Sequence, residues 1–240
     1  MRPRTLAATA LAATICVTAG AAPAVAHPPA PARLSNETTF TRWAGAALLA
    51  RVYAQPTTQS RRVGRLRFLT EDGFPEVYVL LTERADGAGI SWVQLRLPQR
   101  PNNVTGWVRR SALGPFHLVH TRLVVNRRAR RITLFKRGKR RFRARVGVGA
   151  PGTPTPTGHF WIREKFHVSG NALYGTRAMG TAAYSDVLTD WPGGGVIGIH
   201  GTDQPGLIPG RPSHGCVRVR NGDVKRLYAL TPIGTPLLIK

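Results

Sequence analysis

The sequence has few acidic residues and almost no cysteine. Of its 240 residues only 11 are Asp or Glu, against 35 Lys or Arg, which gives a formal net charge of +24. Two cysteines can build neither a multi-disulfide scaffold nor a four-cysteine zinc site. After residue 26 no apolar run reaches the roughly 18 residues that a membrane span requires. About 42% of the residues are nevertheless hydrophobic, enough to bury a core, which excludes a wholly disordered basic tail.

The first 26 residues have the layout of a secretory signal peptide. Arg2 and Arg4 provide a positive start, an apolar stretch follows, and small residues at 24–26 provide a cleavage site. A membrane anchor that stays attached is the alternative. Cleavage would remove Cys16 and leave Cys216 as the single cysteine of a secreted protein, located in the cell wall or the periplasm. Export also argues against nucleic acid as the partner of the basic residues.

Composition divides the remaining chain into three parts. Residues 27–45, which begin rich in Pro and Ala, are expected to be a flexible lead-in. Residues 46–114 hold short apolar runs separated by turn signals, without helical periodicity, which predicts a small β-barrel or sandwich. A second β region follows over residues 118–240. We expect the first module to be accessory and the second to be the catalytic unit.

The first module resembles a bacterial SH3-like domain. The resemblance rests on three short motifs: Val52-Tyr53-Ala54-Gln55-Pro56, Ser91-Trp92-Val93 and Gly106-Trp107-Val108. An unrelated β module is the alternative. If the resemblance holds, residues 46–114 form a small SH3-like barrel.

A basic strand is predicted early in the second region. Phe142, Ala144 and Val146 alternate with three arginines, the period of a strand with one buried face. No acidic residue occurs between Gly87 and Arg163. The arginine-bearing side of this strand is either a binding surface for polyanions, such as anionic wall polymers, or an ordinary solvated surface.

One segment near the C-terminus has helical periodicity. Val224, Leu227 and Tyr228 are spaced i, i+3, i+4 within residues 221–230, and Asn221 is placed to cap the helix. The other segments of this region are strand-like. The predicted fold class is therefore mainly β with one short helix.

The chemistry is expected between His200 and Arg218. His200 ends a predicted strand, and Ser213-His214-Gly215-Cys216-Val217-Arg218 follows a loop rich in Pro and Gly. A thiol becomes an effective nucleophile when a neighbouring imidazole favours its ionisation, and glycine lets backbone N–H groups approach a substrate oxygen. Two alternatives stay open: Cys216 as a small buried hydrophobe, and a zinc site of His200, His214 and Cys216.

The same blocks resemble a known active-site signature. Ile197-Gly198-Ile199-His200-Gly201-Thr202 and the Ser-His-Gly-Cys block at 213–216 are similar to the L,D-transpeptidases (YkuD type) of the bacterial cell wall. Four further matches are Thr155-Pro156-Thr157-Gly158, Tyr174-Gly175-Thr176-Arg177, Asn221-Gly222-Asp223-Val224 and the closing Gly234-Thr235-Pro236. The similarity covers about residues 118–240. Arg218 stands where some members carry Asn.

The resemblance implies a β-sandwich and a reaction on peptidoglycan stem tetrapeptides. Cys216 would attack the carbonyl of the third residue, release D-alanine and pass the acyl group to a side-chain amine of a second stem. His200 would be the general base and acid. The enzyme is expected to be a monomer that needs no metal and no organic cofactor.

The resemblance also implies supporting roles for neighbouring residues. Backbone N–H groups of His214, Gly215 and Cys216 would form the oxyanion hole. Substrate binding would fall to Arg218, Ser213 and Gly201. Two other functions fit the same residues: a cysteine carboxypeptidase that passes the thioester to water, and a non-catalytic protein that binds the cell wall.

Overall fold

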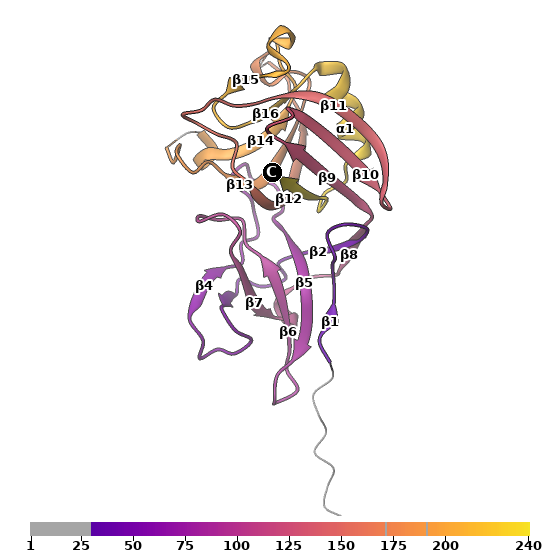
Figure 1. Cartoon of the computed structure of the whole chain (residues 1–240). Coiled ribbons are helices and arrows are strands. Elements are labelled where there is room, and N and C mark those ends of the chain that lie inside the picture. The colour runs from indigo at the N-terminus through magenta and orange to yellow at the C-terminus, as the bar shows by residue number, and fades with distance from the viewer. Residues whose placement is uncertain (1–29, 171, 191) are drawn as a thin grey trace, which may run out of the picture.

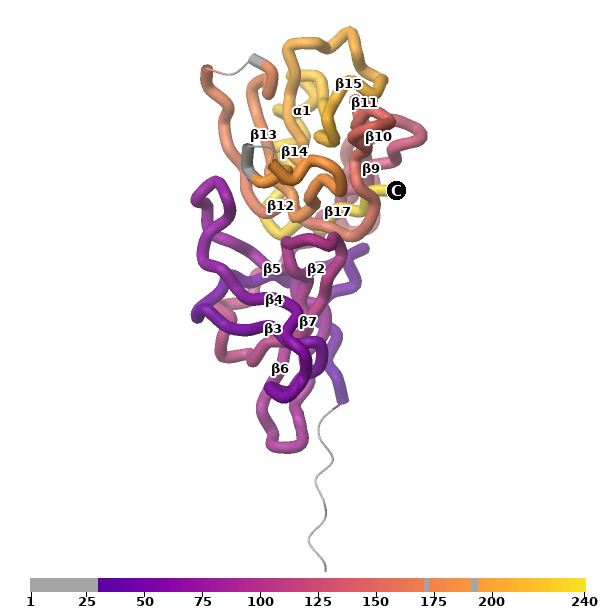
Figure 2. The backbone as a smooth tube through the Cα atoms, turned by 90° about the vertical axis from the view of Figure 1, so that its left-hand side faces the viewer, coloured from indigo at the N-terminus to yellow at the C-terminus, as the bar shows by residue number. Residues whose placement is uncertain are grey.

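Two β units stacked end to end make up the protein, for which we obtained a computed structural model describing residues 30–170, 172–190 and 192–240 (Figure 1). The N-terminal unit lies below the C-terminal unit in this view, and the turned view of Figure 2 shows the same stacking. The signal peptide predicted over residues 1–26 lies outside the described residues. Within the described part, no helix is both long and apolar enough to cross a membrane.

The N-terminal unit is one antiparallel sheet. Its strands are β1 (Ala32–Arg33), β2 (Thr41–Gly45), β3 (Arg51–Tyr53), β4 (Arg62–Arg65), β5 (Val77–Ala85), β6 (Ser91–Arg96), β7 (Thr105–Arg109) and β8 (His117–Val119). They are ordered β4-β3-β7-β6-β5-β2-β8, and β1 pairs with β5. The likeness of residues 46–114 to an SH3-like barrel stays a prediction.

The lead-in expected over residues 27–45 is shorter in the structure. Residues 41–45 form β2, which pairs with β5 on one side and with β8 on the other. Thr41 and Ala44 of this strand are buried. The segment is a strand because neighbouring strands satisfy its backbone on both sides, a tertiary effect that its own weakly apolar sequence does not signal.

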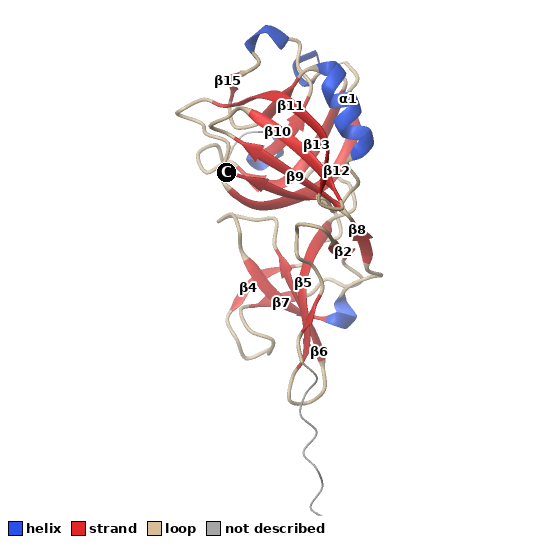
Figure 3. Ribbon diagram, turned by 45° about the vertical axis from the view of Figure 1, so that its right-hand side comes forward, coloured by secondary structure: helices blue, strands red, loops and turns tan. Residues whose placement is uncertain are grey.

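The C-terminal unit is a β-sandwich against which the α-helix α1 (Asn221–Leu230) packs (Figure 3). Its strands are β9 (Thr121–Asn126), β10 (Arg131–Lys136), β11 (Lys139–Gly149), β12 (Gly158–His167), β13 (Arg177–Tyr184), β14 (Val196–His200), β15 (Gly210–Ser213), β16 (Val217–Val219) and β17 (Pro236–Ile239). The order is β10-β9-β17-β12-β13-β14-β16-β11-β15, and a further β10–β11 pairing closes the path on itself. The predicted class, mainly β with one short helix, is confirmed.

Two long strands pass from one layer of the sandwich to the other. Residues 139–145 of β11 pair with β10, whereas residues 146–147 pair with β16. Residues 158–161 of β12 pair with β17, and residues 162–167 pair with β13. Strands that switch layers in this way form the corners of a sandwich. The layer built on β13, β14 and β16 carries the candidate site.

The alternation predicted for the basic strand holds. Phe142, Ala144 and Val146 are buried in the core between the layers, and Arg141, Arg143 and Arg145 are exposed. On α1, Val224 and Leu227 are buried against the same core. The helix therefore packs on the sandwich with the face that its periodicity predicts.

Strand β5 contributes to the cores of both units. Val77 and Val79 belong to the core of the sandwich, while Tyr78 and Leu80 belong to the core of the N-terminal sheet. Because successive side chains of a strand point to opposite faces, one strand supplies both cores. The indole N–H of Trp161 on β12 also donates to the Val77 carbonyl at 2.8 Å. The two units are thus joined by shared apolar packing.

Candidate active site

The floor of the site is formed by two adjacent parallel strands, β14 and β16. Ile199 pairs with Val217, and His200 pairs with Arg218. Ile199 and Val217 are fully buried in the sandwich core. Alternation therefore places His200 and Arg218 on the opposite face of the layer. Because Cys216 lies two residues before Arg218, its side chain shares that face.

Cys216 and His200 converge on Gly198. The Gly198 N–H donates to Cys216 Sγ at 3.3 Å. A Cβ at residue 198 would lie 3.8 Å from His200 Cδ2 and 3.9 Å from Cys216 Sγ, so both side chains face the same point in front of the strand. Glycine at this position leaves the space between thiol and imidazole open. The sequence-predicted pair is thus brought together.

His200 is buried and held in one tautomer. Only 4% of its surface is exposed, and Nδ1 is 2.6 Å from the Gly201 carbonyl oxygen. Because a carbonyl accepts only, Nδ1 carries the proton and Nε2 keeps its lone pair. The Tyr174 ring packs against the imidazole with centroids 4.7 Å apart.

Burial lowers the pKa of the His200 imidazole to about 4, with Arg218 adding to the shift and the Gly201 carbonyl opposing it. Burial raises the pKa of the Cys216 thiol, while the Gly198 N–H and the Arg218 charge oppose the rise. Both effects disfavour charge in this apolar setting. The resting site therefore holds a neutral imidazole, ready to accept a proton, beside a neutral thiol.

Gly201 lies behind the imidazole and does not line the pockets described below. Its N–H donates to the Arg177 carbonyl at 3.1 Å, and its carbonyl holds His200. A Cβ at residue 201 would lie 2.2 Å from Asn221 Oδ1 and 3.0 Å from Gly175 Cα, so no side chain fits there. These contacts make Gly201 a support for the imidazole, and the substrate-binding role expected for it stays a prediction.

Asn221 holds the turn that follows His200. Its Nδ2 donates to the Thr202 carbonyl at 3.0 Å, and its Oδ1 accepts from the Thr202 N–H at 3.3 Å. The residue before α1, Arg220, caps the helix without a side-chain hydrogen bond. Asn221 is thus the first residue of α1 and ties the helix to the site, instead of capping the helix as its position in the sequence suggests.

Ser213 organises the turn that carries the thiol. Its Oγ donates to the Cys216 carbonyl at 2.6 Å and accepts from the Gly215 N–H at 3.3 Å. The Gly215 N–H, one of the three expected oxyanion donors, is therefore already engaged. Gly215 has a φ of +125°, and a Cβ there would lie 2.8 Å from Ile197 Cδ1. Only glycine fits this turn.

A buried threonine ties a second loop to the same turn. Thr155 Oγ1 donates to the Gly215 carbonyl at 2.7 Å and accepts from the Gly149 N–H at 2.9 Å. Thr155 is only 1% exposed. The Pro- and Gly-rich loop at 149–158 is therefore fixed against the Cys216 turn.

Two pockets open on either side of the thiol and the imidazole, and His200 and Cys216 line both. The first, which we name the Arg218 pocket, has a volume of about 310 Å³ and is also lined by Leu173, Tyr174, Ser185, Leu188, Gly195, Val196, Ile197, Ser213, His214 and Arg218. The second, the Glu164 pocket, has a volume of about 420 Å³ and is also lined by Asp72, Glu164, Phe166, His167, Val168, Ser169, Tyr174, Ala178, Met179, Gly180, Val196 and Gly198. Together they form a groove with the thiol at its centre.

The two pockets differ in charge. Among the residues that the structure describes, Arg218 is the one Lys or Arg side chain that lines the first pocket, where its Nη1 donates to Gln204 Oε1 at 3.1 Å. Asp72 and Glu164 line the second. Burial and the charge of Asp72 raise the pKa of Glu164 to about 7, with the Thr70 hydroxyl and Arg163 opposing the rise. One end of the groove is thus basic and the other acidic.

His214 is exposed at the edge of the Arg218 pocket, in contrast to the buried His200. Among the described residues, no three His, Cys, Asp or Glu side chains are grouped as a metal ion requires. The zinc site of His200, His214 and Cys216 considered from the sequence therefore has no ligand set in this part of the chain.

Three residues at the groove are not evident from the sequence. Asp72 comes from the N-terminal unit, and Glu164 ends the stretch of the sequence without acidic residues. That break in an otherwise basic region is the single signal that could have pointed to Glu164. Tyr174 lies within a matched motif, but nothing in the motif shows that its ring contacts His200.

Residues 120–239 match the family model described as the YkuD L,D-transpeptidase catalytic domain, and the chain therefore belongs to the L,D-transpeptidase family. The protein YkuD of Bacillus subtilis, named as an L,D-transpeptidase, is 34% identical over 94 residues, which are 39% of this chain and 50% of YkuD. YqjB of the same organism, also named as an L,D-transpeptidase, is 27% identical over 125 residues, 49% of this chain and 69% of YqjB. The alignment with YkuD thus spans half the length of that relative.

Solved structures of the same family also resemble the chain. The catalytic domain of the Enterococcus faecium L,D-transpeptidase is 28% identical, with a TM-score of 0.37 over 50% of this chain and 96% of that one. An L,D-transpeptidase from Mycobacterium tuberculosis is 14% identical, with a TM-score of 0.45 over 82% of this chain and 98% of that one.

Proposed function

We propose that the protein is a cysteine-dependent L,D-transpeptidase that cross-links peptidoglycan stem peptides. One observation carries the proposal: in a chain of this family, the Cys216 thiol and the neutral His200 imidazole face the same point at the centre of a groove. A thiol beside a neutral base is suited to acyl transfer through a thioester.

The first half of the reaction forms the thioester. His200 Nε2 takes the Cys216 proton as Sγ bonds to the carbonyl carbon of the third stem residue. The tetrahedral intermediate then collapses, its carbon–nitrogen bond breaks, and the imidazolium returns the proton to the amine of the departing D-alanine. Because the imidazole is neutral at rest, it can accept this proton at neutral pH.

The second half passes the acyl group to an amine. A side-chain amine of a second stem attacks the thioester carbonyl and gives a proton to His200. The carbon–sulfur bond breaks, the proton returns to Sγ, and a three-to-three cross-link leaves the site. Atoms and protons balance over the two halves without a cofactor.

Backbone and arginine groups complete this scheme. The oxyanion would be held in the turn at 214–216, and we place the main donor at the Cys216 N–H because the Gly215 N–H points to Ser213 Oγ. Arg218 lines the pocket beside the thiol, and its Nε is buried without a hydrogen-bond partner in the described structure. We assign Arg218 to a substrate carboxylate.

The test is mass spectrometry of products from a purified disaccharide-tetrapeptide. We expect free D-alanine and linked dimers from the unmodified chain, and neither from Cys216→Ala. Free tripeptide stems without dimers would instead identify a carboxypeptidase that uses water. Wall binding that survives Cys216→Ala, with no release of D-alanine even by the unmodified chain, would overturn the enzymatic proposal in favour of a wall-binding protein.

Two further features fit work on the cell wall. The signal peptide predicted over residues 1–26 would export the protein to the cell wall or the periplasm. There it would act as a monomer. The outer face of β9, β10 and β11, which we name the basic face, carries Arg122, Arg131, Arg143 and Arg145. Arg131 lies directly opposite Arg145, and burial with the charges of Arg143 and Arg145 lowers the pKa of Arg131. Like charges placed opposite each other favour an anionic polymer as a partner.

A further inference from the structure

The N-terminal unit reaches the acidic end of the groove through one loop, residues 66–76, between β4 and β5. Asp72 of this loop lines the Glu164 pocket together with Cys216 and His200. Thr70 Oγ1 donates to Glu164 Oε2 at 2.6 Å, and the Phe74 ring stacks on Phe166 with centroids 6.0 Å apart. The loop is therefore a wall of the pocket.

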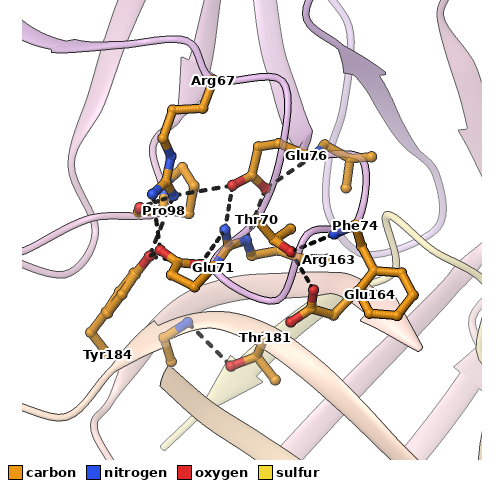
Figure 4. A network of polar contacts seen from close by, with 12 residues as sticks. Arg67, Thr70, Glu71, Phe74, Glu76, Pro98, Arg163, Glu164, Thr181 and Tyr184 are labelled. Atoms are coloured by element: carbon orange, nitrogen blue, oxygen red, sulfur yellow. Dashed lines mark hydrogen bonds and ion pairs between the residues drawn. The ribbon is translucent and has the colours of Figure 1, made fainter. Parts of the chain in front are cut away.

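A buried ion-pair network holds this loop in place (Figure 4). The Arg163 side chain has no exposed surface and lies on β12 of the sandwich, beneath the loop. Its Nε donates to Glu76 Oε1 at 2.8 Å, and its Nη2 donates to Glu71 Oε2 at 2.9 Å and also pairs with Glu76 Oε2. Arg67 of the same loop pairs with Glu71 at 2.9 Å. Two carboxylates of the N-terminal unit, those of Glu71 and Glu76, thus pair with the Arg163 guanidinium of the sandwich.

A second loop of the N-terminal unit, residues 97–104, supports the basic end of the groove. Arg100 donates to the carbonyls of Ser185 at 3.2 Å, Leu188 at 3.0 Å and Gly194 at 2.8 Å. Asn102 accepts from the Tyr184 N–H at 3.0 Å and donates to the Tyr184 carbonyl at 2.8 Å. Ser185 and Leu188 line the Arg218 pocket, so these contacts position its wall.

We propose that the N-terminal unit is part of the substrate site: Asp72 contacts the stem peptide in the Glu164 pocket, and Arg100 positions the wall of the Arg218 pocket. The proposal rests on the proposed function. Neither loop carries the thiol or the imidazole, which lie in the turn before β16 and at the end of β14. Substrate binding then depends on the N-terminal unit, whereas the reactivity of Cys216 does not.

The charges of the groove agree with such a substrate. The chain has only 11 acidic residues, yet Asp72 and Glu164 line one pocket, and the other pocket holds Arg218. A stem peptide in this reaction carries a carboxylate beyond the scissile bond, and the acceptor brings an amine. The acidic pocket is therefore assigned to the amine-bearing part and the basic pocket to the carboxylate.

The experiment compares two variants of the full chain with matched controls. Asp72→Asn and Arg100→Gln are the test variants. Glu83→Gln on β5 and Arg51→Gln on β3 change the charge of the same unit equally but do not line the groove. Three quantities are measured for each: KM and kcat with the stem tetrapeptide, the equilibrium Kd of that peptide, and the alkylation rate of Cys216 by iodoacetamide, which is too small to contact both walls.

We expect KM and Kd to rise about tenfold in each test variant, because a charge-assisted contact is lost, while alkylation stays within about twofold. Arg100→Lys should recover part of the binding, since one ammonium can still reach one carbonyl. The controls should bind like the unmodified chain. Thermal unfolding of every variant verifies that each one is folded.

The outcomes separate this proposal from the proposed function. Unchanged KM and Kd in both folded test variants would overturn the substrate role of the N-terminal unit and leave the transpeptidase intact. Peptide that binds the unmodified chain without forming product would overturn the proposed function alone, and the Kd values would still decide the role of Asp72 and Arg100. An unmodified chain that neither binds nor converts the peptide would overturn both.

Discussion

The two units of the molecule contribute to the groove in different ways. The sandwich supplies the thiol, the imidazole and the turns that hold them, all within β14, β16 and their neighbouring loops. The N-terminal sheet supplies neither the thiol nor the imidazole, but its loops at 66–76 and 97–104 form or support both pocket walls. Our proposals thus divide chemistry and substrate positioning between two units that share a core.

A module that is accessory to the chemistry can still be part of the fold. Val77 and Val79 of β5 pack in the sandwich core, and Glu76 of the adjoining loop pairs with the buried Arg163. A chain cut to residues 115–240 would keep His200 and Cys216 but would leave a buried guanidinium without its carboxylates. Loss of such a partner is strongly destabilising.

The largest effect is expected within the sandwich. His200→Ala should slow acylation of Cys216 by a stem-like acyl donor about 100- to 10,000-fold near neutral pH, because general-base assistance is lost. Stopped-flow measurement with intact-protein mass detection checks the rate, and part of it should return at higher pH as hydroxide ionises the thiol. Cys216→Ser should form no adduct. A His214→Ala variant that slows as much as His200→Ala would contradict the assignment of the base.

The next effect concerns the contact between the units. Glu76→Gln should lower the free energy of unfolding by about 3–5 kcal/mol, because it leaves the charge of Arg163 buried with a weaker partner. Chemical denaturation measures the change, with Glu83→Gln as the control of equal charge. A loss below about 1 kcal/mol would mean that this ion pair contributes little to the stability of the chain.

A smaller effect is expected in the pH dependence of the rate at which Cys216 is acylated. Because burial lowers the pKa of His200 to about 4, the imidazole stays neutral as pH falls from 7.5 to 5.5. An ordinary histidine with a pKa near 6.5 would become mostly protonated over this range and lose about tenfold in base-assisted rate. Acylation of Cys216 by an uncharged donor should therefore stay nearly constant. A tenfold fall centred near pH 6.5 would show that His200 is solvated.

The smallest effect is expected on the basic face. Arg131→Gln should raise the free energy of unfolding by about 0.2–1 kcal/mol at low salt, because it removes a like charge opposite Arg145. The gain should shrink in high salt, which screens the repulsion. Urea titrations at two salt concentrations test this, with Arg51→Gln as control. Destabilisation would mean that Arg131 contributes packing that outweighs the repulsion.

Much of the site was predictable because its signals are local. The alternation of Phe142, Ala144 and Val146 predicts one face of a strand, and the structure buries those residues. The sequence blocks around His200 and Cys216 predict these two residues as the reacting pair. In the structure both side chains face the same point in front of Gly198. Motif spacing suffices there because each block is itself a strand end or a tight turn.

Other features were out of reach because they depend on packing between distant segments. The sequence around Gly201 does not show that its backbone packs closely against Asn221 and Gly175. The Gly215 N–H was expected to serve the oxyanion, but Ser213 Oγ engages it. Asp72 is more than 140 positions from Cys216 in the sequence, and nothing near it indicates a shared pocket.

The sequence by itself determined the mainly β class, the helix over residues 221–230, and the residue types that carry the chemistry. Period-two alternation and short catalytic blocks depend on neighbours in the chain, and the chain holds those neighbours together in any fold. The tertiary structure alone decided that β5 serves two cores, that burial keeps His200 neutral, and that loops of the first sheet wall the groove. These properties depend on which surfaces are buried from water, and that burial exists only once the two units pack against each other.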